Sequence, residues 1–203
     1  MANANRPSGL SPVKHLTGAP FNGQGNIYQI AAADTNGYAI GDPVISSGSG
    51  DANGVPGITL AAATGAIRGV ILGLGNSNGV LAPEAGIFNT NNLNQTIRPS
   101  GAQATDWYAI VADSPDLIFE VQEVTGGTQL AAVDIALNTN LVVGTNNGFQ
   151  SGWQLDNATK GTTATLQVRL LGLSRRSDNA FGAAAKWLVK INNHELSAGT
   201  AGL

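Results

Sequence analysis

The segment Trp107-Tyr-Ala-Ile-Val-Ala-Asp-Ser-Pro-Asp-Leu-Ile-Phe-Glu-Val-Gln-Glu-Val124 indicates the fold class more clearly than any other part of the chain. It holds two runs rich in β-branched and aromatic residues, Trp107–Val111 and Leu117–Val124, on either side of Asp113-Ser-Pro-Asp116. The proline favours a turn, and the carboxylates beside it can accept hydrogen bonds from backbone N–H groups. Apolar and polar residues alternate over Phe119–Gln122, which is typical of a strand with one buried face. The segment therefore predicts a β-hairpin.

Similar short apolar runs recur along the chain, and clusters rich in Gly, Asn and Ser separate them. Helix is scarce, and its one candidate, Gln129–Ala136 behind Thr128, is short and contains β-branched residues. With about eight to ten short strands and no fixed-period repeat, we expect an all-β fold, an antiparallel β-sandwich or jelly roll. Further strands are expected at Ile27–Ile30, Tyr38–Ile45, Ile58–Leu60, Ile67–Leu74, Thr165–Leu170 and Lys186–Ile191, with turn clusters at 46–54 and 75–79.

Residues 1–26 differ from the rest of the chain because they contain Pro7, Pro12, Pro20 and four Gly but no apolar period. This composition predicts an extended N-terminal arm that precedes a single β-sandwich domain at residues 27–203. A frayed terminus is the alternative. As an arm, the segment would contact a partner through apolar anchors and through basic side chains that meet acidic groups. The partner-binding residues expected there are Arg6, Leu10, Val13, Lys14, Leu16 and Phe21.

Charged residues make up 11% of the chain, whereas typical soluble domains carry about 25%. A surface so poor in charge favours a protein that covers part of itself with further copies or a partner. The net charge is −3 and the one adjacent basic pair is Arg175-Arg176, so no nucleic-acid partner is expected. No apolar run approaches the roughly 18 residues of a membrane helix, and the opening residues lack a secretory pattern. We therefore expect synthesis in a cytoplasm and no membrane partner.

The best match to a catalytic motif is Gly75-Asn-Ser-Asn-Gly79, which fits the G-x-S-x-G nucleophile pattern. Asp113 and His194 follow it in the order of a hydrolase triad. The nucleophile turn needs a helix after it, however, and Pro83 would interrupt that helix early. Ser77 is therefore expected in an Asn/Gly loop, and the chain is not expected to be an enzyme. A small serine hydrolase with these three residues is the enzymatic alternative.

Metal and cofactor sites have little support in a chain with two His and no Cys. His194-Glu195 opens the H-E-x-x-H pattern of zinc proteases, but Ala198 stands where the second His belongs. His15 lies beside Lys14, where a structural or interface contact is the simpler explanation. Asp51-Ala-Asn-Gly54 matches part of a calcium loop and lacks its closing Glu, so a turn explains it. We expect neither a metal nor a cofactor.

A family resemblance is carried by segments spread over nearly the whole chain: Asn5–Val13, Gly25–Tyr28, Tyr38–Val44, Ile67–Ile71, Val111–Gln122 and Leu137–Asn140. In pattern and order they resemble the small structural proteins that decorate or cement the heads of tailed bacteriophages, especially those with podovirus-like capsids. The resemblance implies a homo-oligomer, a dimer or trimer, on the capsid exterior of a virion, made in the bacterial host. Its partner would be the major capsid protein, whose neighbouring subunits it bridges. The alternative is a head- or tail-associated adhesin that binds glycans through loops 46–54, 75–79 and 89–95.

Overall fold

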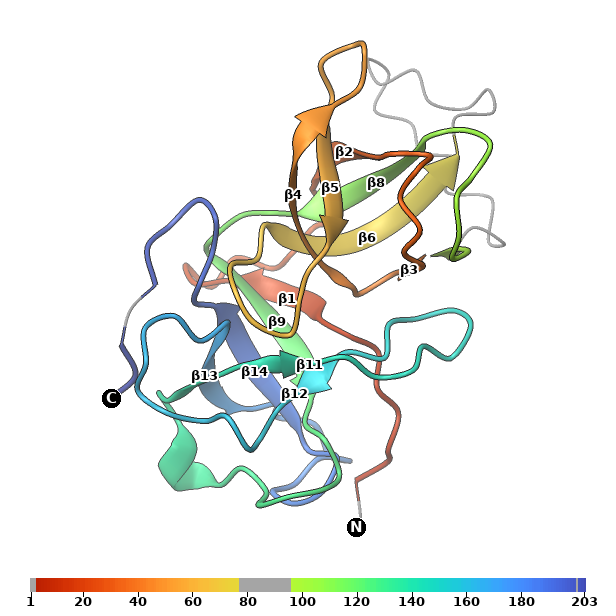
Figure 1. The fold of residues 1–203 in the computed structure, drawn as a ribbon. Coiled ribbons are helices and arrows are strands. Elements are labelled where there is room, and N and C mark those ends of the chain that lie inside the picture. Colours follow the sequence, from red (N-terminus) through yellow and green to blue (C-terminus); the bar gives the residue numbers. More distant parts are fainter. Residues whose placement is uncertain (1–2, 77–95, 200) are drawn as a thin grey trace.

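The computed structural model describes residues 3–76, 96–199 and 201–203. In this part of the chain nearly all regular structure is strand, and the strands pair antiparallel except for β2 with β5. The all-β fold is confirmed, whereas a jelly-roll order of strands is not. Figure 1 shows two β-rich halves, one above the other. We call residues 26–76 and 96–112 the barrel half, and residues 3–25, 113–199 and 201–203 the sheet half.

Five strands of the barrel half close into a small barrel. Its interior is filled by apolar side chains that include Ile30, Val44 and Val111. The order of strands around the barrel is β2 (Asn26–Ile30), β5 (Pro56–Leu60), β4 (Pro43–Gly50), β6 (Gly69–Asn76) and β8 (Trp107–Ala112). A short pair lies outside this order: β3 (Tyr38–Ala39) and β7 (Ile97–Arg98).

The sheet half is built on an open five-stranded antiparallel sheet. Phe119 and Val189 on its inner face pack into a core that also takes Ala61, Ile67 and Val70 from the barrel half. The strand order is β1 (Ser11–His15), β9 (Leu117–Gln122), β14 (Lys186–Ile191), β13 (Val168–Leu173) and β10 (Asn138–Thr139). The remaining pair is β11 (Leu141–Val142) with β12 (Gln154–Leu155).

The hairpin expected at residues 107–124 is not formed, although both of its strands are. β8 pairs with β2 and β6, whereas β9 pairs with β1 and β14. The turn Asp113–Asp116 therefore carries the chain from the barrel to the sheet. The two strands fill different cores, Val111 in the barrel and Phe119 behind the sheet, and both edges of each strand are already occupied. Buried partners distant in sequence decide the pairing here, and local turn chemistry does not.

The strand predicted over Tyr38–Ile45 is divided by a turn at residues 40–42. The N–H of Asp42 donates to the carbonyl oxygen of Ala39 at 3.2 Å. The Asp42 carboxylate in turn accepts the Ala39 N–H at 2.7 Å. Gly41 between them has a φ of 93°, a conformation that suits glycine. This side-chain capping of a turn ends β3 and starts β4.

Other strand boundaries move by a few residues. β4 continues to Gly50, into the turn cluster expected at 46–54, because it pairs with β5. β13 begins at Val168, where pairing with β10 and β14 starts, and not at Thr165. The strands predicted at Ile27–Ile30, Ile58–Leu60, Ile67–Leu74 and Lys186–Ile191 are confirmed as β2, β5, β6 and β14.

The N-terminal segment contacts its own chain far more than the arm prediction implies. Residues 11–15 form β1, an edge strand of the sheet, where proline is tolerated. Leu10 is 1% exposed and belongs to the core, and its N–H donates to Gly41 at 3.0 Å. Residues 19–21 then fold back along β1, which packs Phe21 against the same core. The sheet therefore supplies this segment with both backbone partners and apolar surface.

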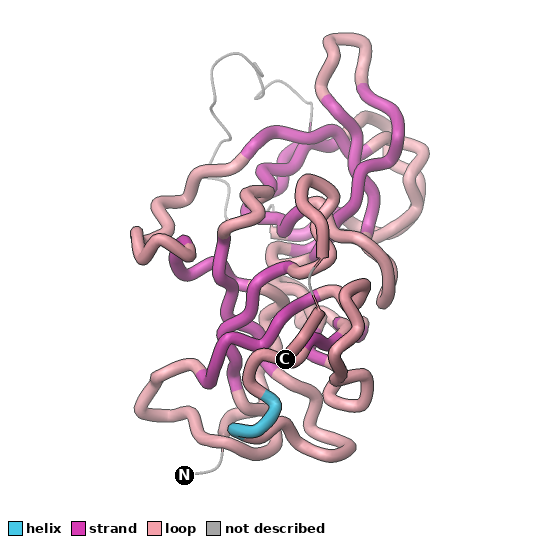
Figure 2. The backbone as a smooth tube through the Cα atoms, turned by 90° about the vertical axis from the view of Figure 1, so that its left-hand side faces the viewer, coloured by secondary structure: helices cyan, strands magenta, loops and turns pink. Residues whose placement is uncertain are grey.

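The helix candidate Gln129–Ala136 reduces to one 3₁₀ turn, η2 (Ala132–Asp134), the single helical element of the described residues (Figure 2). The Asp134 carboxylate accepts the Ala131 N–H and an ion pair from Lys160, both at 2.8 Å. Ala136 adopts a φ of 73°, which ends the turn. A helix this short cannot recover its nucleation cost, so contacts of the side chain set the local shape.

Candidate functional site

A polar network joins the two halves at the point where β8 leaves the barrel. We call it the junction cluster: Asn26, Tyr28, Ser46, Arg68, Asp113 and Glu195. Asp113, 8% exposed, accepts hydrogen bonds from the Asn26 amide at 2.9 and 3.0 Å and from the Tyr28 hydroxyl at 2.6 Å. The Arg68 guanidinium donates to the Tyr28 oxygen at 2.9 Å and lies 3.7 Å from the carboxylate. The cluster thus satisfies a buried carboxylate from several sides.

Glu195 ties the C-terminal segment into this network. Its carboxylate accepts the backbone N–H of Ser46 at 2.9 Å and the Ser46 hydroxyl at 2.5 Å, and lies 3.9 Å from Arg68. Burial, followed by hydrogen bonding to Asp113, raises the pKa of Tyr28 to about 12. The tyrosine therefore stays a neutral donor at any physiological pH. The junction cluster therefore links the barrel to the C-terminal segment of the chain.

The hydrolase alternative places Asp113 and His194 together, and the structure does bring them into one region, while Ser77 lies outside the described residues. The His194 ring is 3% exposed, and its Nδ1 accepts the backbone N–H of Leu196 at 3.0 Å. Nδ1 therefore carries no proton to donate to Asp113, and its lone pair is engaged. Burial, with the charge of Arg68, lowers the pKa of the ring. This orientation differs from a catalytic histidine, which bridges a carboxylate and a nucleophile.

The partial calcium-loop motif forms a turn. The Asp51 carboxylate accepts the backbone N–H groups of Asn53 and Val55, both at 2.8 Å, and the Tyr108 hydroxyl at 2.8 Å. These contacts lower the pKa of Asp51, although burial acts first and in the opposite direction. The described ranges hold no group of three or more His, Cys, Asp or Glu that could bind a metal. They also contain no helix long and apolar enough to cross a membrane.

The residues expected to bind a partner lie in different environments. Val13 is 42% exposed on β1 and Lys14 beside it is exposed, as is Leu16 in the following turn. Arg6 is exposed and Phe21 is half-buried, whereas Leu10 is buried in the chain's own core and so presents no surface to a partner. Of the adhesin loops, 46–50 belongs to β4, while 77–79 and 89–95 lie outside the described residues.

A broad groove of about 880 Å³ crosses the outer face of the five-stranded sheet. Leu188 of β14 and Leu171 of β13 contribute apolar surface, and Phe181, 49% exposed, stands over it with its ring 5.7 Å from that of Trp187. Ile135, next to η2, is also exposed there. We call this feature the sheet groove, and its lining is Val13, Lys14, Ile135, residues 171–176, Asn179, Phe181 and Leu188.

Basic residues flank the apolar part of the sheet groove. On β14 the outward residues run Lys186, Leu188, Lys190, so a leucine lies between two lysines. The strand register adds a row across the sheet, which we call the basic row: Lys14, Ile118, Lys190 and Arg169. Its members are far apart in sequence and become neighbours only through pairing.

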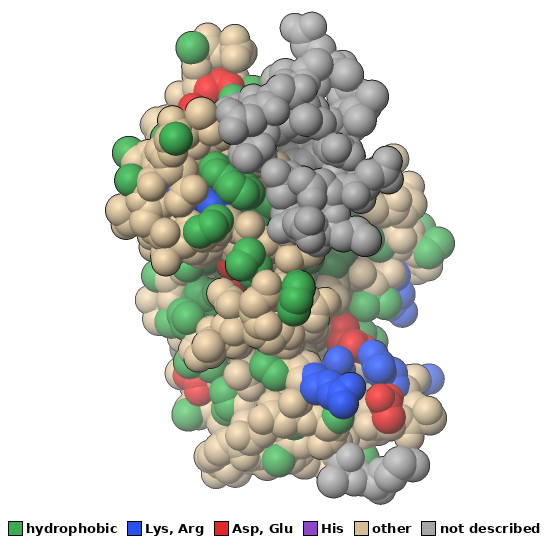
Figure 3. Space-filling view, turned by 90° about the vertical axis from the view of Figure 1, so that its right-hand side faces the viewer, with side chains coloured by type: hydrophobic (Ala, Val, Ile, Leu, Met, Phe, Trp, Pro, Cys, Tyr) green, Lys and Arg blue, Asp and Glu red, His purple; other side chains and the backbone are tan. Residues whose placement is uncertain are grey.

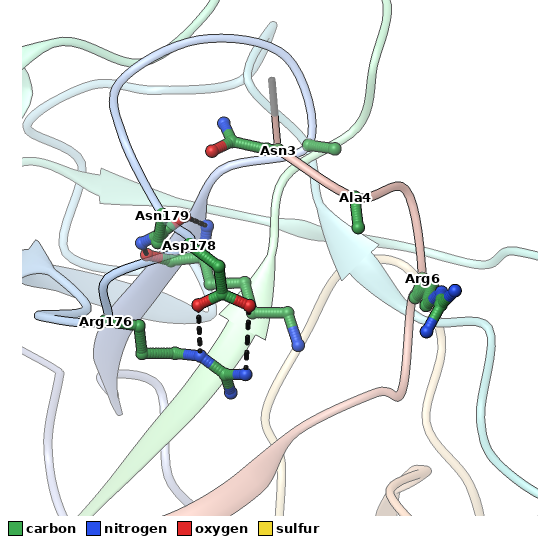
Figure 4. Close-up of a pocket in the computed structure, with 8 residues that line it drawn as sticks. Asn3, Ala4, Arg6, Arg176, Asp178 and Asn179 are labelled. Atoms are coloured by element: carbon green, nitrogen blue, oxygen red, sulfur yellow. Dashed lines mark hydrogen bonds and ion pairs between the residues drawn. The ribbon is translucent and has the colours of Figure 1, made fainter. Parts of the chain in front are cut away.

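Beside the groove, a smaller pocket of about 120 Å³ is lined by paired charges (Figure 4). Arg176 contacts Asp178 at 3.1 Å and Glu120 at 3.2 Å, and Figure 3 shows Lys and Arg gathered around acidic side chains in the lower part of the molecule. Asn3 holds the N-terminal residues there, since its amide donates to the carbonyl oxygens of Ala180 and Ala183 at 2.8 and 3.0 Å. Arg6 and Lys186 add two further basic side chains to the lining of this pocket.

Sequence reasoning missed the sheet groove, although part of its signal was available. Alternation in the two last predicted strands puts Arg169 and Lys190 on polar faces. The order of the strands in the sheet brings Arg169, Lys190 and Lys14 onto the same face. Alternation within a single strand does not reveal that order. Comparison of the chain with protein-family models, with curated proteins and with solved structures found no match.

Proposed function

We propose that the protein is a structural component of a bacteriophage particle that binds the outer surface of the capsid and cements neighbouring major capsid subunits. The observation that carries the proposal is the sheet groove, in which exposed apolar side chains lie together on one face. A contiguous apolar patch with a polar rim is typical of a protein-binding surface. The resemblance of the chain to head decoration proteins supplies the kind of partner.

The position of Val13 and Lys14 on a paired strand favours this function. A partner surface on a sheet is ordered before binding, so little conformational entropy is lost when the complex forms. A capsid repeats one site many times, and a dimer or trimer that engages two copies turns the second contact into an intramolecular one. Binding to the assembled shell alone then stabilises the shell by mass action.

The test is decoration of purified shells by the Phe181→Glu variant, followed by sedimentation and quantification of the bound protein. A charge in the apolar part of the sheet groove should lower occupancy at least about tenfold, since a desolvated anchor near an interface centre carries much of the binding energy. Phe149→Glu is the matched control, because Phe149 is 67% exposed and outside the groove. Val13→Glu on the edge strand is a second variant, independent of the contact between Phe181 and Trp187.

Wild-type protein that fails to bind shells at micromolar concentration would contradict the function itself. Equal losses for Phe181→Glu and Phe149→Glu would contradict the groove as the site of contact.

A further inference from the structure

The charge around the sheet groove is strongly one-sided. Six of the ten basic residues of the chain lie on the outer face of the sheet or in the loop after β13, whereas the chain as a whole carries −3. Two acids accompany them, Glu120 and Asp178, and both are held by Arg176. The six basic residues are Lys14, Arg169, Arg175, Arg176, Lys186 and Lys190.

Within the described residues, Lys14 and Lys190 form no ion pair. Lys190 also lies directly opposite Arg169 in the β13–β14 register, both on the outer face. Like charges in directly opposed positions repel each other and weaken a sheet. An acidic group placed over this pair would offset the repulsion.

The apolar component distinguishes the surface from a simple polyanion site. Leu188 lies between Lys186 and Lys190 along β14, so exposed apolar surface of the sheet groove borders the basic row. The basic row crosses three strand spacings, about 14 Å, which is the length of about four residues of extended chain. Successive side chains of an extended segment point to opposite faces, so a segment that presents both acidic and apolar side chains on one face matches this surface in charge and in polarity.

We propose that the sheet groove and the basic row together bind an extended protein segment in which pairs of acidic residues alternate with pairs of apolar ones, so that each face of the segment carries both kinds of side chain. The binding chemistry is independent of the proposed function; only the assignment of this segment to the capsid surface rests on it. The acidic side chains of the segment lie over Lys14, Lys190 and Arg169, and the apolar ones contact Leu188 and Phe181.

The experiment measures binding of fluorescently labelled short peptides to the full chain by anisotropy. One peptide repeats Glu-Glu-Leu-Leu, so that each face of the extended peptide carries both residues, a second replaces Glu by Gln, and a third replaces Leu by Ser. We expect the first to bind, and each replacement to weaken binding at least about tenfold, because acidic and apolar side chains both contribute. A single-stranded oligonucleotide and a second copy of the chain, monitored by sedimentation, are the competing occupants.

Two variants locate the site. Lys190→Glu should weaken the Glu/Leu peptide at least about tenfold, and Lys14→Glu on the exposed edge strand should act in the same direction. The matched control is Ala52→Glu with Asn53→Glu, which makes the same change in net charge in the exposed β4–β5 loop at the far end of the barrel (Figure 1). This control should leave the affinity unchanged.

Equal binding of the Glu and Gln peptides, or tighter binding of the oligonucleotide than of the Glu/Leu peptide, would overturn the proposal. Self-association of the protein through the groove that the Glu/Leu peptide does not displace would also overturn it. So would a control variant that loses as much affinity for the Glu/Leu peptide as Lys190→Glu does. Shell decoration separates this proposal from the function. Peptide binding without decoration contradicts the capsid role alone, whereas decoration that Lys190→Glu leaves intact contradicts the groove chemistry alone.

Discussion

The barrel half and the sheet half use arginine and lysine in opposite ways. In the barrel half Arg98 is 1% exposed, donates to three backbone carbonyl oxygens and lies 5.6 Å over the Tyr38 ring. Arg68 is likewise committed to the junction cluster. In the sheet half the basic side chains lie on an outer face beside apolar surface. Cations therefore hold the barrel half together, while in the sheet half Lys14 and Lys190 lie on the outer face and form no ion pair among the described residues.

The largest expected effect comes from removal of the buried cation. Arg98→Met should lower the free energy of unfolding by about 4 kcal/mol, because the carbonyl oxygens of Ala31, Asp34 and Asn36 lose their donor in a buried site. Arg175→Met, at an exposed position in the sheet half, is the control and should change it by less than about 0.5 kcal/mol. Urea denaturation measures both. Equal losses of unfolding free energy for Arg98→Met and Arg175→Met would contradict the different use of cations in the two halves.

The second prediction concerns pH, through one buried carboxyl group in each half. Burial raises the pKa of Asp42 to about 6 and that of Glu123 to about 6. In the unfolded chain both groups titrate near 4, so folding favours their protonated forms. Their contribution to stability is full below pH about 4 and is lost as the pH rises through about 6. Both carboxyl groups therefore disfavour the folded state at neutral pH.

Asp42→Asn removes this dependence in the barrel half, and Glu123→Gln removes it in the sheet half. Between pH 4 and pH 7 the Asp42→Asn variant should gain about 3 kcal/mol of unfolding free energy relative to the wild type. For Glu123→Gln we expect a shift of about 2 kcal/mol. Comparison with the wild type at each pH cancels His194, whose lowered pKa acts in the opposite direction. A difference that does not vary with pH would contradict the burial of these groups.

Strands could be predicted from the sequence where the pattern of polar and apolar residues within a single segment indicates a strand. Lys186–Ile191 carries lysines at two positions of one face and apolar residues at every position of the other, and the structure places β14 at these residues. Pairing was not predictable, as the missing hairpin at 107–124 shows, because β8 and β9 each find partners far away in sequence. β1 was missed because its proline hides an edge strand that needs β9 beside it. The basic row depends on all of these pairings at once, so it could not be read from any one segment.

The smallest expected effect has the opposite sign and bears directly on the comparison. Lys190→Thr should raise the free energy of unfolding by a few tenths of a kcal/mol, because it removes a like charge opposite Arg169 and places a β-branched residue in a strand. The gain should shrink in high salt, where the repulsion is already screened. Lys160→Thr is the control: Lys160 lies 2.8 Å from Asp134, so its loss should destabilise the protein. If Lys190→Thr stabilises the free protein and also weakens binding of the acidic peptide, Lys190 serves binding and not stability. If Lys190→Thr destabilises the protein, the basic row has a structural role like that of Arg98.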